Sequence, residues 1–176
     1  MTKSLDFYFD FVSPYTYLAY KKIKKLSETE KIKVNYFPIL LGALHNLNNI
    51  KAGAFIHSKA RFMIKDCKMV AKKFNINFKF NSHFPINSLY LMRGALVINK
   101  KFIPCYIENF FNAYWKDDLD LGNEKIIKQI LLKCKIETKA FYEAIEQKKT
   151  KNKLKKFTQH AFDKGVFGAP TFIVNK

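Results

Sequence analysis

Two short segments near opposite ends of the chain constrain its fold most strongly, Leu5–Ala19 and Gly165–Val174. The first reads LDFYFDFVSPYTYLA. Its alternating pattern and its break at Ser13-Pro14 predict a buried strand and then a helix, with the serine as N-cap and the proline as first helical residue. The second segment, GVFGAPTFIV, has a glycine helix stop and then Ala169-Pro170 ahead of a strand, Thr171–Val174. Together these segments predict that the start of the first helix, at Ser13-Pro14, lies opposite the backbone that precedes Pro170.

The pattern between these segments predicts the order strand, helix, strand, about five helices and one last strand. A first strand at Asp6–Val12 and a second at Lys31–Pro38, joined by a helix, favour parallel pairing. The segment His45–Ser58 is predicted to be a loop. This loop leads to a helix with an apolar stripe that ends at Phe74. Further helices are expected at Ser88–Asn99, Asn123–Cys134, Thr138–Gln147 and Lys151–Lys164, with one more starting at Pro104.

This order predicts an α/β protein with a thioredoxin-like fold and a helical insertion between strands two and three. We expect a discontinuous thioredoxin-like domain of residues 1–44 and 154–176, and an inserted helical subdomain of residues 45–153.

The chain carries a net charge of +18, but this charge does not favour nucleic acid as a partner. Arg61 and Arg93 are the only arginines among its 32 basic residues. Nucleic-acid sites favour arginine, and lysines spread over every predicted helix are typical of an AT-rich genome. No apolar run approaches a membrane span, so no membrane partner is expected. The start of the chain does not resemble a signal peptide, which indicates a cytoplasmic protein.

The cysteines and histidines predict neither redox nor metal chemistry. Cys67, Cys105 and Cys134 are scattered and form no C-x-x-C pair, so we interpret them as reduced thiols in the core. The four histidines have no metal-binding spacing.

Several motifs resemble, in their order, the pattern of one enzyme family. They are FDFVSPYTYLAY, FPILLGAL, SKARFMIKD, HFPINSL, FNAYW and KNKLKKFTQHAFDKGVFGAPTF. This pattern is similar to that of the 2-hydroxychromene-2-carboxylate isomerases, which are relatives of the kappa-class glutathione transferases within the DsbA-like group. The resemblance implies a DsbA-like fold and glutathione as cofactor. It also implies isomerisation of 2-hydroxychromene-2-carboxylate or a related conjugated aromatic acid, in aromatic catabolism.

Ser13 is the first candidate site residue. The residues alone favour a helix cap, whereas the resemblance implies that its hydroxyl donates to the glutathione sulfur. Ser13 and Thr16 occupy the positions of a C-x-x-C pair, which disfavours a disulfide oxidoreductase. The resemblance also implies a cis bond at Ala169-Pro170, whose backbone would pair with the cysteinyl part of glutathione, although most X-Pro bonds are trans.

Four further positions are candidates for contact with glutathione or with the substrate. Asn49, or alternatively Asn48, and Lys59 match the family's glutathione-contacting Asn and Lys, but they also suit a turn residue and a solvated lysine. Asn87 either caps the next helix, which we favour, or faces the substrate ring. Arg93 either pairs with a substrate carboxylate or, as we favour, forms a structural ion pair.

Other functions stay open at this point. The same site suits a kappa-like glutathione transferase or peroxidase acting on other electrophiles, and the fold also suits a non-catalytic binding protein. Dimers are usual in the family, which implies a homodimer. The family pattern continues with a further strand and helix that this chain lacks. We therefore expect Thr171–Val174 to be an exposed sheet edge and glutathione to bind weakly.

Overall fold

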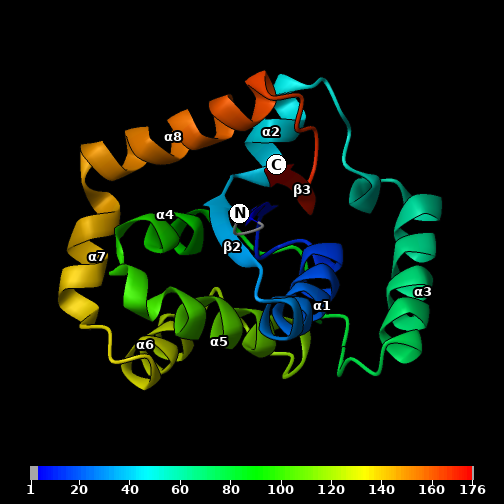
Figure 1. Cartoon of the computed structure of the whole chain (residues 1–176), viewed down its shortest axis with the longest axis horizontal. Coiled ribbons are helices and arrows are strands. Elements are labelled where there is room, and N and C mark those ends of the chain that lie inside the picture. The colour runs from blue at the N-terminus through cyan, green and yellow to red at the C-terminus, as the bar shows by residue number, and fades with distance from the viewer. Residues whose placement is uncertain (1–3, 176) are drawn as a thin grey trace.

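The computed structural model describes residues 4–175, which fold around a three-stranded sheet (Figure 1). The strands are β1 (Ser4–Phe9), β2 (Lys33–Pro38) and β3 (Thr171–Asn175), in the order β2-β1-β3. The pairing of β1 with β2 is parallel, as predicted, and β3 runs antiparallel to β1. The last strand therefore lies at one edge of the described sheet.

The helices occupy the crossover between β1 and β2 and the long connection between β2 and β3. They are α1 (Pro14–Glu30), α2 (Leu41–Leu47), α3 (His57–Lys73), α4 (Leu89–Val97), α5 (Ile103–Trp115), α6 (Glu124–Lys133), α7 (Thr138–Glu146) and α8 (Lys148–Asp163), with short 3-10 turns η1 (Gly53–Phe55) and η2 (Lys100–Phe102). This order confirms the predicted helical insertion. Among the described residues, no helix is long and apolar enough to cross a membrane.

Several element boundaries differ from those predicted from the sequence, and one of these differences is caused by Asp10. Strand β1 ends at Phe9 rather than Val12, because the Asp10 carboxylate accepts the Val12 N–H at 3.1 Å and closes a turn. The segment His45–Ser58, predicted as a loop, contains the end of α2 and the turn η1. The first N–H of α2 is paired with the same carboxylate, so the helix starts without a local capping signal.

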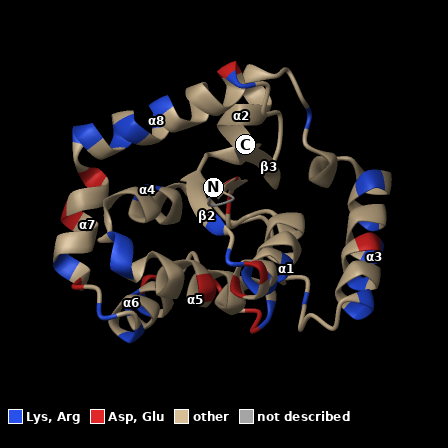
Figure 2. Cartoon of the chain, viewed as in Figure 1, with Lys and Arg blue, Asp and Glu red and all other residues tan. Residues whose placement is uncertain are grey.

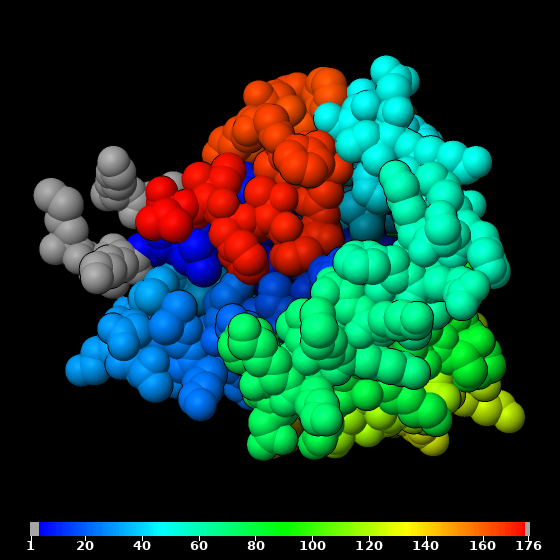
Figure 3. All heavy atoms as spheres, turned by 90° about the vertical axis from the view of Figure 1, so that its right-hand side faces the viewer, coloured from blue at the N-terminus to red at the C-terminus, as the bar shows by residue number. Residues whose placement is uncertain are grey.

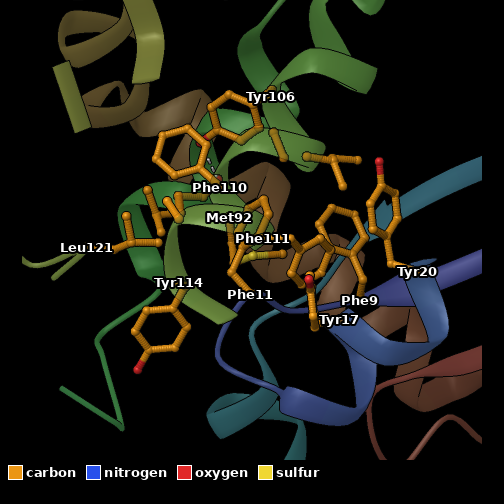
Figure 4. Close-up of a cluster of buried hydrophobic side chains, with 14 of the residues drawn as sticks. Phe9, Phe11, Tyr17, Tyr20, Met92, Tyr106, Phe110, Phe111, Tyr114 and Leu121 are labelled. Atoms are coloured by element: carbon orange, nitrogen blue, oxygen red, sulfur yellow. Dashed lines mark hydrogen bonds between the residues drawn. The ribbon is translucent and has the colours of Figure 1, made fainter. Parts of the chain in front are cut away.

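The alternation of β1 divides the core between the two faces of the sheet. Phe7 and Phe9 point to one face and join a large aromatic cluster, whereas Tyr8 points to the other face and packs with residues of α2 and α8. Figure 4 shows Phe9 and Phe11 meeting Phe111. Helix α5, which supplies Phe111, therefore covers the face opposite α8.

Trp115, the only tryptophan in the chain, anchors the turn that precedes α1. Its ring is fully buried, and its indole Nε1–H donates to the Phe11 carbonyl at 2.8 Å. This bond satisfies the polar edge of a buried aromatic side chain. Because Phe11 lies two residues before Ser13, the core directly fixes the start of α1.

The prediction that all three cysteines are reduced core thiols is wrong for two of them. Cys105 in α5 and Cys134, which caps the C-terminus of α6, form a disulfide. The two residues lie 29 positions apart, so their spacing gave no C-x-x-C signal. Cys67 is free and buried in α3, as expected.

Candidate functional site

A cleft of about 1090 Å³ opens beside the N-terminus of α1. Its lining residues come from five segments that are distant in sequence: 10–15, 40–46, 50–63, 84–88 and 167–169. Figure 3 views the side of the molecule on which α3 lies, where the surface is recessed between α2 and the segment before β3. Apolar side chains dominate these walls, so the cleft suits a ligand with a flat apolar part.

Ser13 lies in this cleft and caps α1, as predicted. Its Oγ accepts a hydrogen bond from the Thr16 N–H at 3.2 Å and donates its single proton to the Ala169 carbonyl at 2.9 Å. Pro14 has no N–H, and the Tyr15 N–H has no carbonyl within the helix to pair with. An anion placed here would meet a hydroxyl and the positive end of a helix.

The backbone before Pro170 forms the opposite wall of the cleft. The Ala169-Pro170 bond is cis, in agreement with what the resemblance implied, and Ala169 lines the cleft while Pro170 does not. Thr171 Oγ1 donates to the Gly168 carbonyl at 2.8 Å and so closes the turn into β3. The predicted meeting of a helix start with a pre-proline backbone is therefore present.

Asp10 holds the walls of the cleft together, and sequence reasoning did not find it. The fully buried carboxylate accepts N–H groups from Val12 at 3.1 Å and Leu41 at 2.8 Å, and it is also hydrogen-bonded to the Ser88 side chain. Burial raises the pKa of Asp10, and these hydrogen bonds oppose that rise. One carboxylate thus joins the turn before α1 to the starts of α2 and α4. A lone acid at the end of a buried strand was the available signal.

Few charged groups line the cleft. Lys59, at the start of α3, is its cation, since burial lowers the pKa of the other basic residue, His45, and favours the neutral imidazole. Asn46 of α2 lines the cleft, whereas the predicted Asn49 and its alternative Asn48 are not among the lining residues. Asn49 has a left-handed backbone with φ of 54° just after α2.

The two residues that the sequence analysis considered for contact with the aromatic substrate, Asn87 and Arg93, differ in whether they line the cleft. Asn87 lines the cleft, and its Oδ1 accepts the Leu89 N–H at 3.1 Å at the start of α4. Arg93 is not a lining residue; its side chain is 13% exposed and pairs with Glu146 at 3.3 Å. The ion pair agrees with the favoured interpretation of Arg93, whereas the N-cap residue of α4 is Ser88, so Asn87 contacts the helix start from one residue before the cap.

Among the residues that the structure describes, no cysteine lines the cleft. Burial raises the pKa of the free Cys67 thiol to about 12, so this thiol stays protonated at neutral pH. Among residues 4–175 there is no group of three or more His, Cys, Asp or Glu that could hold a metal ion. Any sulfur nucleophile in this cleft must therefore come from a ligand.

Comparison with known proteins agrees with this fold. A 2-hydroxychromene-2-carboxylate isomerase of Sphingobium xenophagum is 23% identical over 181 residues, which cover 99% of this chain and 90% of that protein. Glutathione S-transferase kappa 1 of Caenorhabditis elegans is 34% identical over 73 residues, 41% of this chain and 32% of that protein. The solved structure of a 2-hydroxychromene-2-carboxylate isomerase matches with a TM-score of 0.89 and 23% identity, over 98% of this chain and 85% of that one. The family model of the DSBA-like thioredoxin domain matches residues 4–176, so the chain belongs to this family.

Proposed function

We propose that this protein is a glutathione-dependent isomerase of 2-hydroxychromene-2-carboxylate or a related conjugated aromatic acid. The observation that carries the proposal is the meeting of the Ser13 hydroxyl, the start of α1 and the Ala169 carbonyl inside one apolar-walled cleft. The isomerases and kappa transferases among its relatives add support, since both kinds of protein match this chain.

Glutathione fits the groups present. It would supply a sulfur nucleophile that adds reversibly to a conjugated double bond, so that the bond can rotate. In this proposal Ser13 donates to the sulfur, the Ala169 backbone pairs with the peptide, and Lys59 binds a carboxylate. Pro170 fixes the orientation of Ala169. A contact from Asn49 stays a prediction, and Asn46 is an alternative amide that lines the cleft.

The single proton of Ser13 sets the order of events in the cleft. While this proton is donated to the Ala169 carbonyl, it is not available to a sulfur anion. When the hydroxyl turns toward the sulfur, the Ala169 carbonyl becomes free to accept an N–H group of the ligand. The hydrogen bond between Ser13 and Ala169 is thus lost, and each of these two residues forms a hydrogen bond with the ligand instead.

The charge of the cleft favours a second candidate, a kappa-like transferase or peroxidase acting on uncharged electrophiles. Arg93 is paired with Glu146, and Lys59 is needed for glutathione in the first proposal. The apolar part of the cleft around Phe55, Phe62 and Phe84 brings no cation of its own for a substrate carboxylate.

A single series of measurements on one sample separates these functions. Calorimetric titration with glutathione comes first, followed by the glutathione-dependent absorbance change of the chromene carboxylate and by conjugation of an uncharged aromatic electrophile. Turnover of the acid supports the isomerase, and turnover of the neutral compound alone supports the transferase. Glutathione binding without either turnover would indicate a binding protein, and absence of glutathione binding would contradict the whole proposal.

The domain division predicted from the sequence stays a proposal, and under it the cleft would be lined by both parts. The lining residues of the cleft come both from the proposed thioredoxin-like domain, residues 1–44 and 154–176, and from the proposed helical subdomain, residues 45–153. A homodimer and a cytoplasmic location stay predictions. Sedimentation of the purified protein tests the first, and fractionation of the cells that make it tests the second.

A further inference from the structure

The outward face of α3 exposes large apolar side chains. Phe62 is 67% exposed and Met69 64%, and Phe55, in the turn just before the helix, is 67% exposed. Phe62 and Met69 are seven residues apart, so they lie on the same side of the helix, opposite the buried Cys67 and Ala71. Figure 3 looks directly at this side of the molecule.

The same face is strongly basic. Helix α3 carries six basic residues, Lys59, Arg61, Lys65, Lys68, Lys72 and Lys73, and a single acid, Asp66 (Figure 2). Asp66 is hydrogen-bonded to the Tyr15 hydroxyl and so is directed toward α1. Within residues 4–175, none of the six cations forms an ion pair with a carboxylate. The outward face therefore combines unpaired positive charge with exposed apolar tips.

We propose that this face of α3 docks onto an anionic lipid surface. Lysines beside such a surface gain from its negative potential, while aromatic and methionine side chains bury their apolar tips at the headgroup boundary. A second copy of the chain fits this face poorly, because two such faces would bring like charges together. The expectation of no membrane partner considered only a spanning segment, which surface docking does not require.

Docking in this orientation would bring the lipid close to the cleft. Phe55 and Phe62 belong both to the exposed face and to the lining of the cleft. A flat apolar compound dissolved in the membrane would then reach the cleft past these two rings without crossing bulk water.

Helix α8 provides a matched control within the same molecule. It also has six basic residues and one acid, Asp163. In contrast to α3, none of the exposed large apolar side chains of the described chain lies on α8. A lipid surface that recognised positive charge alone would bind α3 and α8 equally well. Docking by α3 depends also on its exposed apolar side chains, which α8 lacks.

The first experiment compares two charge reversals by co-sedimentation with vesicles at about 0.1 M salt, where exposed charges act over about 10 Å. The pair Lys65→Glu and Lys72→Glu reverses charge beside Phe62 and Met69. The pair Lys149→Glu and Lys156→Glu makes the same change, at the same spacing, on α8. With vesicles of phosphatidylcholine and about 30% phosphatidylglycerol, the α3 pair should lose about tenfold or more in affinity and the α8 pair less than about threefold.

The second experiment tests whether side chains of α3 contact the lipid directly, and not only whether the protein is attracted to the vesicle by charge. Met69→Trp places a fluorophore on the proposed face, and Leu132→Trp places one on α6 at a nearly equal exposure of 65%. The native Trp115 is buried and supplies a constant background. On adding anionic vesicles, emission of the Met69→Trp protein should shift to the blue and be quenched by brominated lipid, while that of Leu132→Trp should not change.

Four results would overturn the proposal. They are no binding to anionic vesicles, equal loss for the α3 and α8 pairs, binding to pure phosphatidylcholine as strong as to anionic vesicles, and an unchanged Met69→Trp emission. Two further findings would replace lipid by another partner: a dimer in sedimentation that the α3 pair alone disrupts, or DNA retention that it alone abolishes.

Discussion

At the scale of single residues, the two hydrogen bonds of Ser13 have separable roles. One caps α1, and the other places the hydroxyl in the cleft. We predict that Ser13→Ala lowers turnover about a hundredfold, because a donor to developing negative charge is lost. Glutathione affinity measured by calorimetry should change little. Loss of the cap should cost about 1 kcal/mol of unfolding free energy.

The control for this prediction is Asn123→Ala, which removes the side-chain cap of α6 without touching the cleft. It should cost a similar amount of stability in denaturant unfolding and leave turnover unchanged. Equal turnover of Ser13→Ala and the native protein at saturating glutathione would contradict the role given to the hydroxyl.

The candidate residues that the structure brings together in the cleft are those that have local sequence signatures. Ser-Pro at a helix start and Ala-Pro before a strand are short patterns, and the structure brings Ser13 and Ala169 together. Asp10 has no such signature, because Leu41 and Ser88, its partners, are distant in sequence. Asn46 lines the cleft but was not predicted, because the segment from His45 onward was expected to be a loop and not the end of α2.

At the scale of elements, Glu108 joins α5 to α1. Its carboxylate is hydrogen-bonded by Lys21 and by the Tyr20 hydroxyl at 2.8 Å, and Lys24 lies at 3.2 Å. Burial alone would raise the pKa of Glu108, but these bonds and the Asn112 amide lower it to about 2. The folded state therefore binds this proton less readily than the unfolded state does.

From this lowered pKa we predict that Glu108→Gln reduces the unfolding free energy by about 1 kcal/mol at pH 7, allowing for solvent screening. The difference from the native protein should be fully present above about pH 5 and fade as pH falls toward 2. Urea unfolding across this range measures it, with the exposed Glu143→Gln as control. A difference that stayed constant with pH would contradict the assigned cause.

The second prediction at the scale of elements concerns the disulfide between Cys105 and Cys134. Closing a loop of about 29 residues restricts the unfolded chain, so reduction should cost about 3 kcal/mol of stability. A reductant should lower the Tm of the native protein and leave that of the double variant Cys105→Ala, Cys134→Ala unchanged. Alkylation after denaturation should label one thiol, Cys67, without reductant and three with it. Three labelled thiols in unreduced protein would contradict the pairing.

This pairing also bears on the predicted cytoplasmic location, since glutathione keeps most thiols reduced there. The same alkylation on freshly lysed cells would report which form the protein has in its compartment. Sequence spacing did not predict the pair, because Cys105 and Cys134 approach only when α5 and α6 pack together.

At the scale of the whole molecule, the net charge of +18 acts against compactness. We predict that raising sodium chloride from about 20 mM to about 300 mM raises the Tm by roughly 2–4 °C, because salt screens this repulsion. The pair Lys149→Glu, Lys156→Glu removes four units of net charge and should show a smaller rise. An equal rise in both proteins, or a fall in the native protein, would contradict the explanation.

The overall fold was predictable because local and global signals agree. The alternation of β1, the Ser-Pro helix start and the βαβ crossover all led to the observed parallel pairing of β1 with β2, whereas no local pattern indicated that β3 would pair antiparallel with β1. The end of β1 was predicted three residues too late, since Asp10 turns the chain by a contact that periodicity does not contain. Strand β3 lies at an edge of the described sheet, as expected.

The bond between Ser13 and Ala169 spans 156 positions of sequence, and this has a consequence for protein synthesis. A nascent chain leaves the ribosome with its N-terminus first, so β1 and the start of α1 emerge long before residue 169 does. Until then β1 lacks its β3 neighbour, and the cleft lacks one wall. A prematurely terminated polypeptide that keeps every helix would still be unable to assemble the pocket. Ligand binding during translation would therefore report the arrival of β3 and the segment before it.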